Sequence, residues 1–168
     1  MPKCIMLIGL PGVGKTTWLQ DNMDILPPRT DSGYPPYVAS SDFFIEEVAK
    51  VLGTTYSEIF PPIIGYAERA FGKYVATLAF NGYDFIVDRT NLHPKSRREV
   101  MDRVMKNAKE EYQFEAIVFK TPDPTTHTNR LCGRHGKYIS DEVMNKMKKI
   151  YTPPTNAEGF TNIRFLEV

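Results

Sequence analysis

Residues 9–16 read Gly9-Leu10-Pro11-Gly12-Val13-Gly14-Lys15-Thr16, and this stretch decides the fold. The spacing is G-x-x-x-x-G-K-[ST], which is typical of a loop that wraps phosphate groups. Its glycines let the backbone bend, so that successive N–H groups point at one anion at the positive end of the following helix. An apolar run at 4–8 precedes the loop and residues 17–20 suit a helix. The sequence therefore places the motif at a strand-to-helix turn.

The side chains at the end of this loop predict a nucleotide site with a metal ion. Lys15 supplies a mobile charge for the outer phosphates, and the Thr16 hydroxyl is the expected ligand of Mg²⁺. A glycine-rich turn that merely links a strand to a helix explains neither residue. We expect ATP to be bound by Gly12, Val13, Gly14, Lys15, Thr16 and Thr17.

The composition indicates a single domain, residues 1–168, with little net charge. The chain has 21 basic and 20 acidic residues and a formal net charge of +1, so nucleic-acid binding must depend on local clusters. The two cysteines, Cys4 and Cys132, form no C-x-x-C pair, which fits a reducing compartment. No long apolar segment or signal-like region is present in the sequence, and we expect a cytoplasmic protein with no membrane partner.

Strand-like and helix-like segments alternate along the chain. Strands are predicted at 4–8, 37–39, 83–88, 113–119 and 162–166, and helices at 17–20, 43–52, 64–80, 94–108 and 140–151. Residues 27–36 are rich in turn formers, and 53–62 are expected to be irregular. The apolar stripe of the helix at 94–108 leaves four basic residues free to face outward: Lys95, Arg97, Arg98 and Arg103. The alternation predicts an α/β fold, a doubly wound, mostly parallel five-stranded sheet with helices on both faces.

Two aspartates follow predicted strands, at the edge where such sheets bind ligands. Asp42 follows the strand at 37–39, and Asp88 ends the strand at 83–88. Phosphoryl transfer needs a metal ion and an acceptor oxygen held in line, often by a carboxylate that takes its proton. We expect Asp88 to act on Mg²⁺, through water, and Asp42 to be the general base. The structural alternatives are a strand-end turn residue at 88 and a helix N-cap at 42.

A basic segment at 126–137 is predicted to form a lid. Arg130 and Arg134 are four residues apart, so on a helix they project from one face, and Gly133 and Gly136 would let its end move. Such a lid would close over ATP and bring both guanidinium groups to the transferring phosphoryl group. The alternative is a solvated basic face. The three histidines lack companion ligands at metal spacing and are expected on the surface: His93, His127 and His135.

These segments together resemble the kinase domain of bacteriophage polynucleotide kinase. The resemblance covers nearly the whole chain and is carried in order by the loop at 9–16, Ser41-Asp42-Phe43-Phe44, Asp88-Arg89-Thr90-Asn91-Leu92-His93-Pro94, and finally Arg130 and Arg134. It implies ATP-dependent phosphorylation of a hydroxyl group on nucleic acid, with DNA as the expected substrate. It also implies Lys15 and Thr16 at the donor, Asp42 as the base and the two arginines in the lid. For a phage protein, the compartment would be the host cytoplasm.

One departure from that family leaves the acceptor open. An arginine three positions after the catalytic aspartate usually contacts the acceptor strand's phosphate, and this chain has Ile45 there. Some phage kinases of similar build phosphorylate a hydroxymethyl group on a modified pyrimidine, such as 5-hydroxymethyluracil, which must leave the base stack. Three aromatic residues could stack such a base or belong to the core: Tyr56, Phe60 and Tyr66. A small-nucleoside kinase and a module that hydrolyses ATP without an acceptor are further alternatives, and the oligomeric state stays open.

Overall fold

Five parallel strands form one sheet in a computed structural model that describes residues 1–23 and 37–167. The strands are β1 (Lys3–Ile8), β2 (Tyr37–Ala39), β3 (Phe85–Asp88), β4 (Gln113–Phe119) and β5 (Asn162–Leu166). Their order is β2-β3-β1-β4-β5, and each of the four neighbouring pairs is parallel. The predicted five-stranded α/β sheet is confirmed. The turn-rich segment at 27–36 lies outside the described residues.

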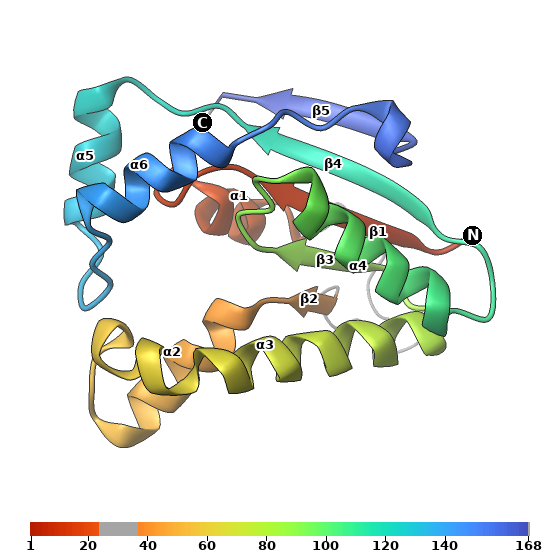
Figure 1. Ribbon diagram of the computed structural model, residues 1–168, viewed down its shortest axis with the longest axis horizontal. Coiled ribbons are helices and arrows are strands. Elements are labelled where there is room, and N and C mark those ends of the chain that lie inside the picture. Colours follow the sequence, from red (N-terminus) through yellow and green to blue (C-terminus); the bar gives the residue numbers. More distant parts are fainter. Residues whose placement is uncertain (24–36, 168) are drawn as a thin grey trace.

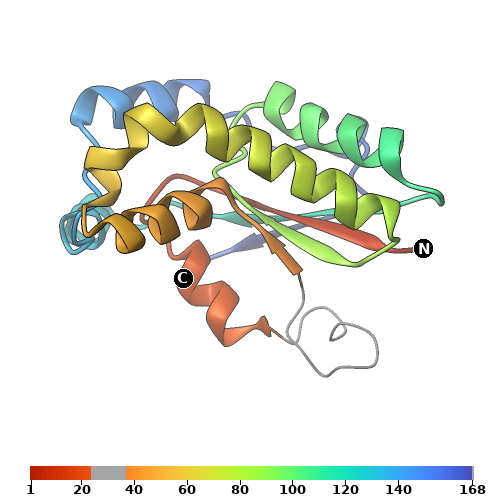
Figure 2. The same ribbon diagram turned by 90° about the horizontal axis from the view of Figure 1, so that it is seen from below.

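β1 is central because its side chains are apolar on both faces of the sheet. Cys4, Met6 and Ile8 pack with side chains from α3 (Tyr56–Phe80) and α4 (Pro94–Asn107) on one face. Ile5 and Leu7 pack with side chains from α1 (Lys15–Asp21) on the other. Figure 2 shows α1 below the sheet and α3 and α4 above it. The sheet is therefore covered on both faces, as predicted.

The remaining helices lie toward the carboxyl ends of the strands. α2 (Ser41–Leu52) follows β2 and packs beside α3, whereas α5 (Pro124–Cys132) and α6 (Asp141–Ile150) lie beyond the tips of β4 and β1 (Figure 1). A short 3₁₀ helix (Asn156–Glu158) precedes β5. Within the two described ranges, no helix has the length and apolar character needed to span a bilayer.

α3 begins at Tyr56, so the prediction of an irregular segment at 53–62 is wrong. Thr55 caps the helix: its Oγ1 accepts a hydrogen bond from the Glu58 amide at 3.3 Å, and Glu58 Oε2 accepts one from the Thr55 amide at 2.9 Å. This capping box fixes the first turn. Pro61 and Pro62 remain inside the helix and are exposed, so water can reach the carbonyl groups that their missing N–H groups leave unpaired.

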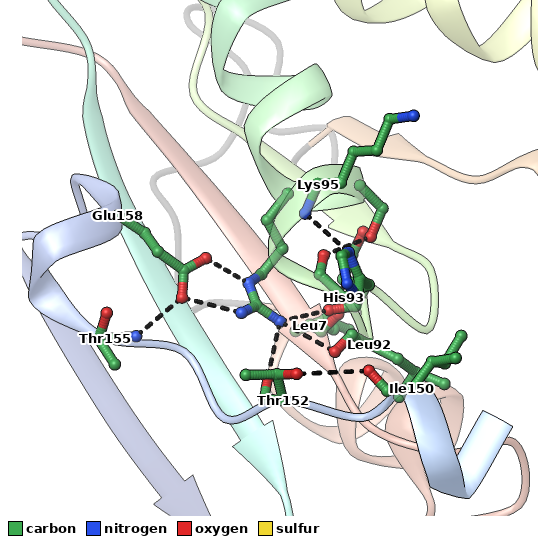
Figure 3. A network of polar contacts seen from close by, with 11 residues as sticks. Leu7, Leu92, His93, Lys95, Ile150, Thr152, Thr155 and Glu158 are labelled. Atoms are coloured by element: carbon green, nitrogen blue, oxygen red, sulfur yellow. Dashed lines mark hydrogen bonds and ion pairs between the residues drawn. The ribbon is translucent and has the colours of Figure 1, made fainter.

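Arg97 is fully buried, contrary to the predicted outward position. Its Nε and NH2 atoms donate to both carboxylate oxygens of Glu158, at 2.7 and 2.8 Å. NH1 donates to the carbonyl oxygens of Asn91 at 2.9 Å, Leu92 at 3.2 Å and Thr152 at 3.0 Å. Figure 3 shows Glu158 and Thr152 around this guanidinium group. The side chain therefore joins the loop after β3 to the segment that follows α6.

Candidate functional site

The loop after β1 turns directly into α1, which begins at Lys15. Gly14 caps the helix with φ 99°, a left-handed conformation that favours glycine. The Lys15 side chain is buried, and its Nζ donates to the carbonyl oxygens of Gly9 at 2.8 Å and Leu10 at 2.9 Å. Burial lowers the pKa of Lys15 to about 8, although the negative charge of Asp88 opposes this shift. The Lys15 side chain therefore lies within the loop, close to the Asp88 carboxylate at the end of β3.

The loop after β3 supports the phosphate-binding loop. Thr90 accepts a backbone hydrogen bond from Gly9 at 3.0 Å, and the buried Asn91 side chain donates to the Leu7 carbonyl oxygen at 2.8 Å. Asn91 has φ 48°, a left-handed conformation that asparagine tolerates better than most residues. The Thr-Asn-Leu segment that carries part of the family resemblance therefore has a structural role, because it fixes the exit of β1.

Asp42 lies in the first turn of α2 but does not cap it. The cap is Ser40, whose side chain accepts a hydrogen bond from the Phe43 amide at 3.3 Å, so the alternative of a simple N-cap at 42 is wrong. Asp42 Oδ1 accepts a hydrogen bond from the Tyr56 hydroxyl at 2.8 Å. Its Oδ2 pairs with Lys137 Nζ at 2.5 Å. The aspartate is therefore held by one residue of α3 and one from the loop after α5.

These partners keep the Asp42 carboxylate ionised. Burial by itself would raise the pKa of Asp42, but the Lys137 charge, the hydrogen bonds from Lys137 and Tyr56, and the charge of Arg134 outweigh it. The pKa of Asp42 therefore lies below its usual value. Neither Tyr56, as a partner of Asp42, nor Lys137 was singled out from the sequence. Lys137 belongs to the predicted lid, but its contact with a residue 95 positions away has no local signal.

Arg130 and Arg134 do not share a helix, because α5 ends at Cys132. Arg130 NH1 donates to the Val13 carbonyl oxygen in the phosphate-binding loop at 3.4 Å. Arg134 lies in the turn that follows, and its charge lowers the pKa values of both Lys15 and Asp42. Its NH1 atom is buried and has no hydrogen-bond partner among the described residues. A buried guanidinium nitrogen of this kind favours an anion beside it.

α5 packs directly on the phosphate-binding loop. His127 is buried, so its predicted surface position is wrong, and its Nε2 lies 2.8 Å from the Pro11 carbonyl oxygen. Gly12 has φ 79°, which favours glycine, and a Cβ atom there would lie 2.9 Å from Leu131 Cδ2, so a larger residue would be strained and would push this leucine side chain aside. The histidine was misplaced because an isolated histidine has no sequence pattern that marks a contact with a distant loop.

Thr16 and Asp88 have the oxygen donors that Mg²⁺ prefers, and the residues present fit this ion. Thr16 is exposed in the first turn of α1, and Asp88 ends β3 beside β1. Burial raises the pKa of Asp88, with Lys15 opposing it. Residues 1–23 and 37–167 contain no group of three or more His, Cys, Asp or Glu residues able to hold a metal ion. Phosphate oxygens and water would therefore complete the coordination.

The three aromatic residues that could stack a base have different surroundings. Lys137 Nζ lies over the Tyr56 ring, 4.0 Å from its centroid. The centroids of the Tyr56 and Phe60 rings are 5.5 Å apart. Tyr66 is 64% exposed and lies beneath the Arg69 guanidinium group, so it is no core residue either. Ile45 of α2 is fully buried. The cation beside Asp42 therefore comes from the loop after α5 and not from α2.

Several solved structures have a fold similar to that of this chain. The chain aligns over 98% of its length with 84% of a protein from Chloroflexus aurantiacus provisionally named a kinase, at 17% identity and TM-score 0.70. It aligns over 97% with 88% of Kti12 from Chaetomium thermophilum in complex with ADP-AlF3, at 17% identity and TM-score 0.60. A chain of the Pnkp1/Rnl/Hen1 RNA repair complex matches 88% of this chain at 21% identity and TM-score 0.63, but only 43% of its own length is covered.

The sequence also matches a family model over most of its length. Residues 4–154 match the AAA_33 family, described as an AAA domain. The matched range includes the phosphate-binding loop, Asp42, Asp88 and both lid arginines. The chain therefore belongs to the AAA_33 family and has the nucleotide-binding P-loop NTPase fold.

Proposed function

We propose that the chain is an ATP-dependent kinase that transfers the γ-phosphate to a hydroxyl group on nucleic acid. The observation that carries this proposal is the electrostatic coupling of Lys15, Arg134 and Asp42, which come from three separate segments. Lys15 belongs to the donor loop, and Asp42 is an ionised carboxylate suited to a hydroxyl proton. Arg134 acts on both and has a buried nitrogen without a partner among the described residues.

The proposed reaction assigns one task to each of these groups. The loop amides and Lys15 bind the β- and γ-phosphates, and Asp42 orients the acceptor hydroxyl. The hydroxyl oxygen forms a bond to the γ-phosphorus, the bond from that phosphorus to the β–γ bridging oxygen breaks, and ADP leaves. The hydroxyl proton passes to an Asp42 carboxylate oxygen. Arg134 NH1 donates to the transferring phosphoryl group, whose charge is spread over three oxygens.

Thr16 and Asp88 would hold Mg²⁺, Thr16 directly and Asp88 through water. When bound, the ion neutralises charge on the β- and γ-phosphate oxygens. Lys15 lies beside both positions, adjacent to Thr16 in sequence and close enough to Asp88 for its charge to lower the pKa of that carboxyl. This arrangement leaves Asp42, which has its own partners, for the acceptor.

The acceptor class rests on sequence resemblance and on shared fold. Four segments resemble the phage polynucleotide kinase, and a chain of an RNA repair complex has a similar fold. A 5′-hydroxyl end is the acceptor that this likeness favours. The absence of a cation at position 45 keeps a hydroxymethyl group on a modified pyrimidine, and a free nucleoside, as alternatives to be tested.

Acceptor competition tests the proposal. Protein and γ-labelled ATP would be offered a 5′-hydroxyl DNA oligonucleotide, its RNA equivalent, end-blocked DNA with 5-hydroxymethyluracil, and nucleosides. We expect label on the 5′-hydroxyl oligonucleotides. Label on end-blocked DNA alone would replace the 5′ end with the modified base as acceptor. ATP hydrolysis without label on any acceptor would reject the kinase proposal in favour of an ATP-driven module.

Two variants separate the donor from the acceptor half of the site. Lys15→Met should abolish transfer with little loss of stability: two hydrogen bonds to loop carbonyl oxygens are lost, but burial already disfavours the charged amine, as its lowered pKa shows. Asp42→Asn should lower kcat by about 100-fold or more while ATP binding is retained. Kinetics and ATP titrations of both variants measure this. Near-normal turnover of either one would reject its assigned role.

A further inference from the structure

One turn of the chain brings a cation to each half of the site. Arg134 and Lys137 lie three residues apart, and the Lys137 amide donates to the Arg134 carbonyl oxygen at 3.2 Å, which closes the turn. The Arg134 charge acts on Lys15 in the donor loop, whereas Lys137 Nζ contacts Asp42. The two side chains therefore cannot be placed independently, since a tight turn of backbone fixes both.

Among the described residues, the Tyr56 hydroxyl donates to Asp42 Oδ1 and Lys137 Nζ donates to Oδ2. A carboxylate oxygen accepts two hydrogen bonds, so each oxygen retains a site for an acceptor hydroxyl. Two partners from different segments also fix the plane of the carboxylate. Lys137 is itself held, because its Nζ lies 3.0 Å from Glu46 Oε1 and 4.0 Å from the centre of the Tyr56 ring.

We propose that Tyr56 and Lys137 are positioning residues that orient the Asp42 carboxylate and keep it ionised, so that the base is ready only when the turn at 133–137 is docked. The inference rests on the proposed role of Asp42 as the base. It couples the two halves of the site, because the same docked turn delivers Arg134 to the donor side. A nucleotide that favours the docked turn would thereby prepare the base.

Two contacts that dock this turn do not involve the Lys137 side chain. The Ser57 amide donates to the Gly136 carbonyl oxygen at 3.0 Å, and Ser57 Oγ accepts from the Tyr138 amide at 2.8 Å. Both bonds join backbone atoms of the turn to Ser57, which lies at the start of α3 (Figures 1 and 2). Replacing the Lys137 side chain therefore changes the surroundings of Asp42 and leaves these contacts in place.

The direction of the pH effect follows from the groups around Asp42. Its charged neighbours and titratable partners come from five segments: Tyr56 of α3, Arg134 and Lys137 of the turn, Glu46 of α2, Lys15 of the loop and Asp88 of β3. Lys137 and Tyr56 favour the carboxylate, while burial disfavours it. Removing either partner leaves burial less opposed, so the pKa of Asp42 must rise.

The first test measures Asp42 in the nucleotide-free protein. Carbon-13 NMR of labelled aspartate, assigned with Asp42→Asn, follows this carboxyl through a pH titration. We expect Lys137→Gln and Tyr56→Phe to raise its pKa, while Lys137→Arg, which keeps the charge, changes it little. Tyr138→Phe is the matched control, because this neighbouring tyrosine is 81% exposed. A pKa unchanged in both Lys137→Gln and Tyr56→Phe would overturn the inference.

The second test is the pH profile of kcat, taken as the ratio of variant to unaltered protein so that the ionisation of ATP cancels. For Lys137→Gln we expect this ratio to be roughly three- to tenfold lower at about pH 5 than at about pH 8, where it should approach one. A loss independent of pH would show a structural role and overturn the inference. If Asp42→Asn turns over normally, the proposed base fails instead, and the NMR result still reports whether the two partners control its ionisation.

Discussion

The buried side chain of Arg97 lies outside the site and stabilises the loop that supports it. Arg97 has no exposed surface, and its donors reach Glu158 and three backbone carbonyl oxygens. Two of these carbonyls belong to Asn91 and Leu92, in the loop that supports the phosphate-binding loop. A buried ion pair gains stability only if its remaining polar atoms are also satisfied, and here the carbonyl groups complete it.

Arg97→Met tests this arrangement. The change should lower the free energy of unfolding by about 3–5 kcal/mol, because Glu158 loses the guanidinium group that neutralises it and the carbonyl oxygens of Asn91, Leu92 and Thr152 each lose one donor. Urea denaturation measures the loss. Lys95→Met, an exposed residue of the same helix, is the control and should change stability by no more than about 0.5 kcal/mol. Equal stability of the two variants would contradict the assigned role of Arg97.

Sequence reasoning can place a residue when the signal that marks it is local. Lys15 and Thr16 were predicted from a contiguous motif, and Asp42 from its position after a strand. Arg97 was misplaced because helical periodicity assigns charged residues to the solvent face, and its partner Glu158 lies 61 positions away. No pattern within one helix shows that a distant carboxylate will neutralise a buried guanidinium group.

At the scale of elements, α5 is the element that connects the lid to the donor loop. It contacts the loop through the His127 ring and the Leu131 side chain, which lies against Gly12. The turn after α5 then docks on the start of α3 through Gly136 and Ser57. One short helix therefore lies between the phosphate-binding loop and the turn that carries Arg134.

His127→Phe should weaken ATP binding about three- to tenfold, because the Pro11 carbonyl oxygen in the loop loses its partner. His127→Gln retains a donor and should bind more tightly than the phenylalanine variant. Isothermal titration with ATP measures both affinities. The control is His135→Phe, an exposed histidine of the same lid segment. If His127→Phe and His135→Phe bind ATP equally well, the contact between α5 and the loop does not contribute to the donor site.

The predicted start of α3 was wrong because two local signals conflict. Pro61 and Pro62 predicted an irregular segment, yet Thr55 and Glu58 form a capping box that begins α3 before them. The T-x-x-E spacing was visible in the sequence and is the signal that would have corrected the prediction. α5, in contrast, ends before Arg134, so the expected shared face of the two lid arginines does not exist.

At the scale of the whole molecule, the parallel sheet explains why Asp42 and Asp88, which were predicted to follow strands, lie near Lys15 of the phosphate-binding loop. Each of the five strands runs in the same direction, so the loops after β1, β2 and β3 lie at one edge. Apolar runs between polar turns are enough to predict that order of elements. The docking of the turn at 133–137 onto α3 is different, since it depends on side-chain contacts that no periodicity encodes.

The charge of the whole molecule predicts how an oligonucleotide acceptor depends on salt. With 21 basic and 20 acidic residues, the chain has no general attraction for a polyanion, so phosphate contacts must come from local cationic groups. Each contact on a single strand contributes about 0.7 to the slope of log affinity against log salt. At saturating ATP, we expect the KM of a 5′-hydroxyl oligonucleotide to rise with a slope of about one to two, which corresponds to two or three contacts. A nucleoside acceptor, which carries no phosphate, is the control, and its KM should show almost no dependence on salt. A slope steeper than about four would contradict this expectation and require an extended basic surface.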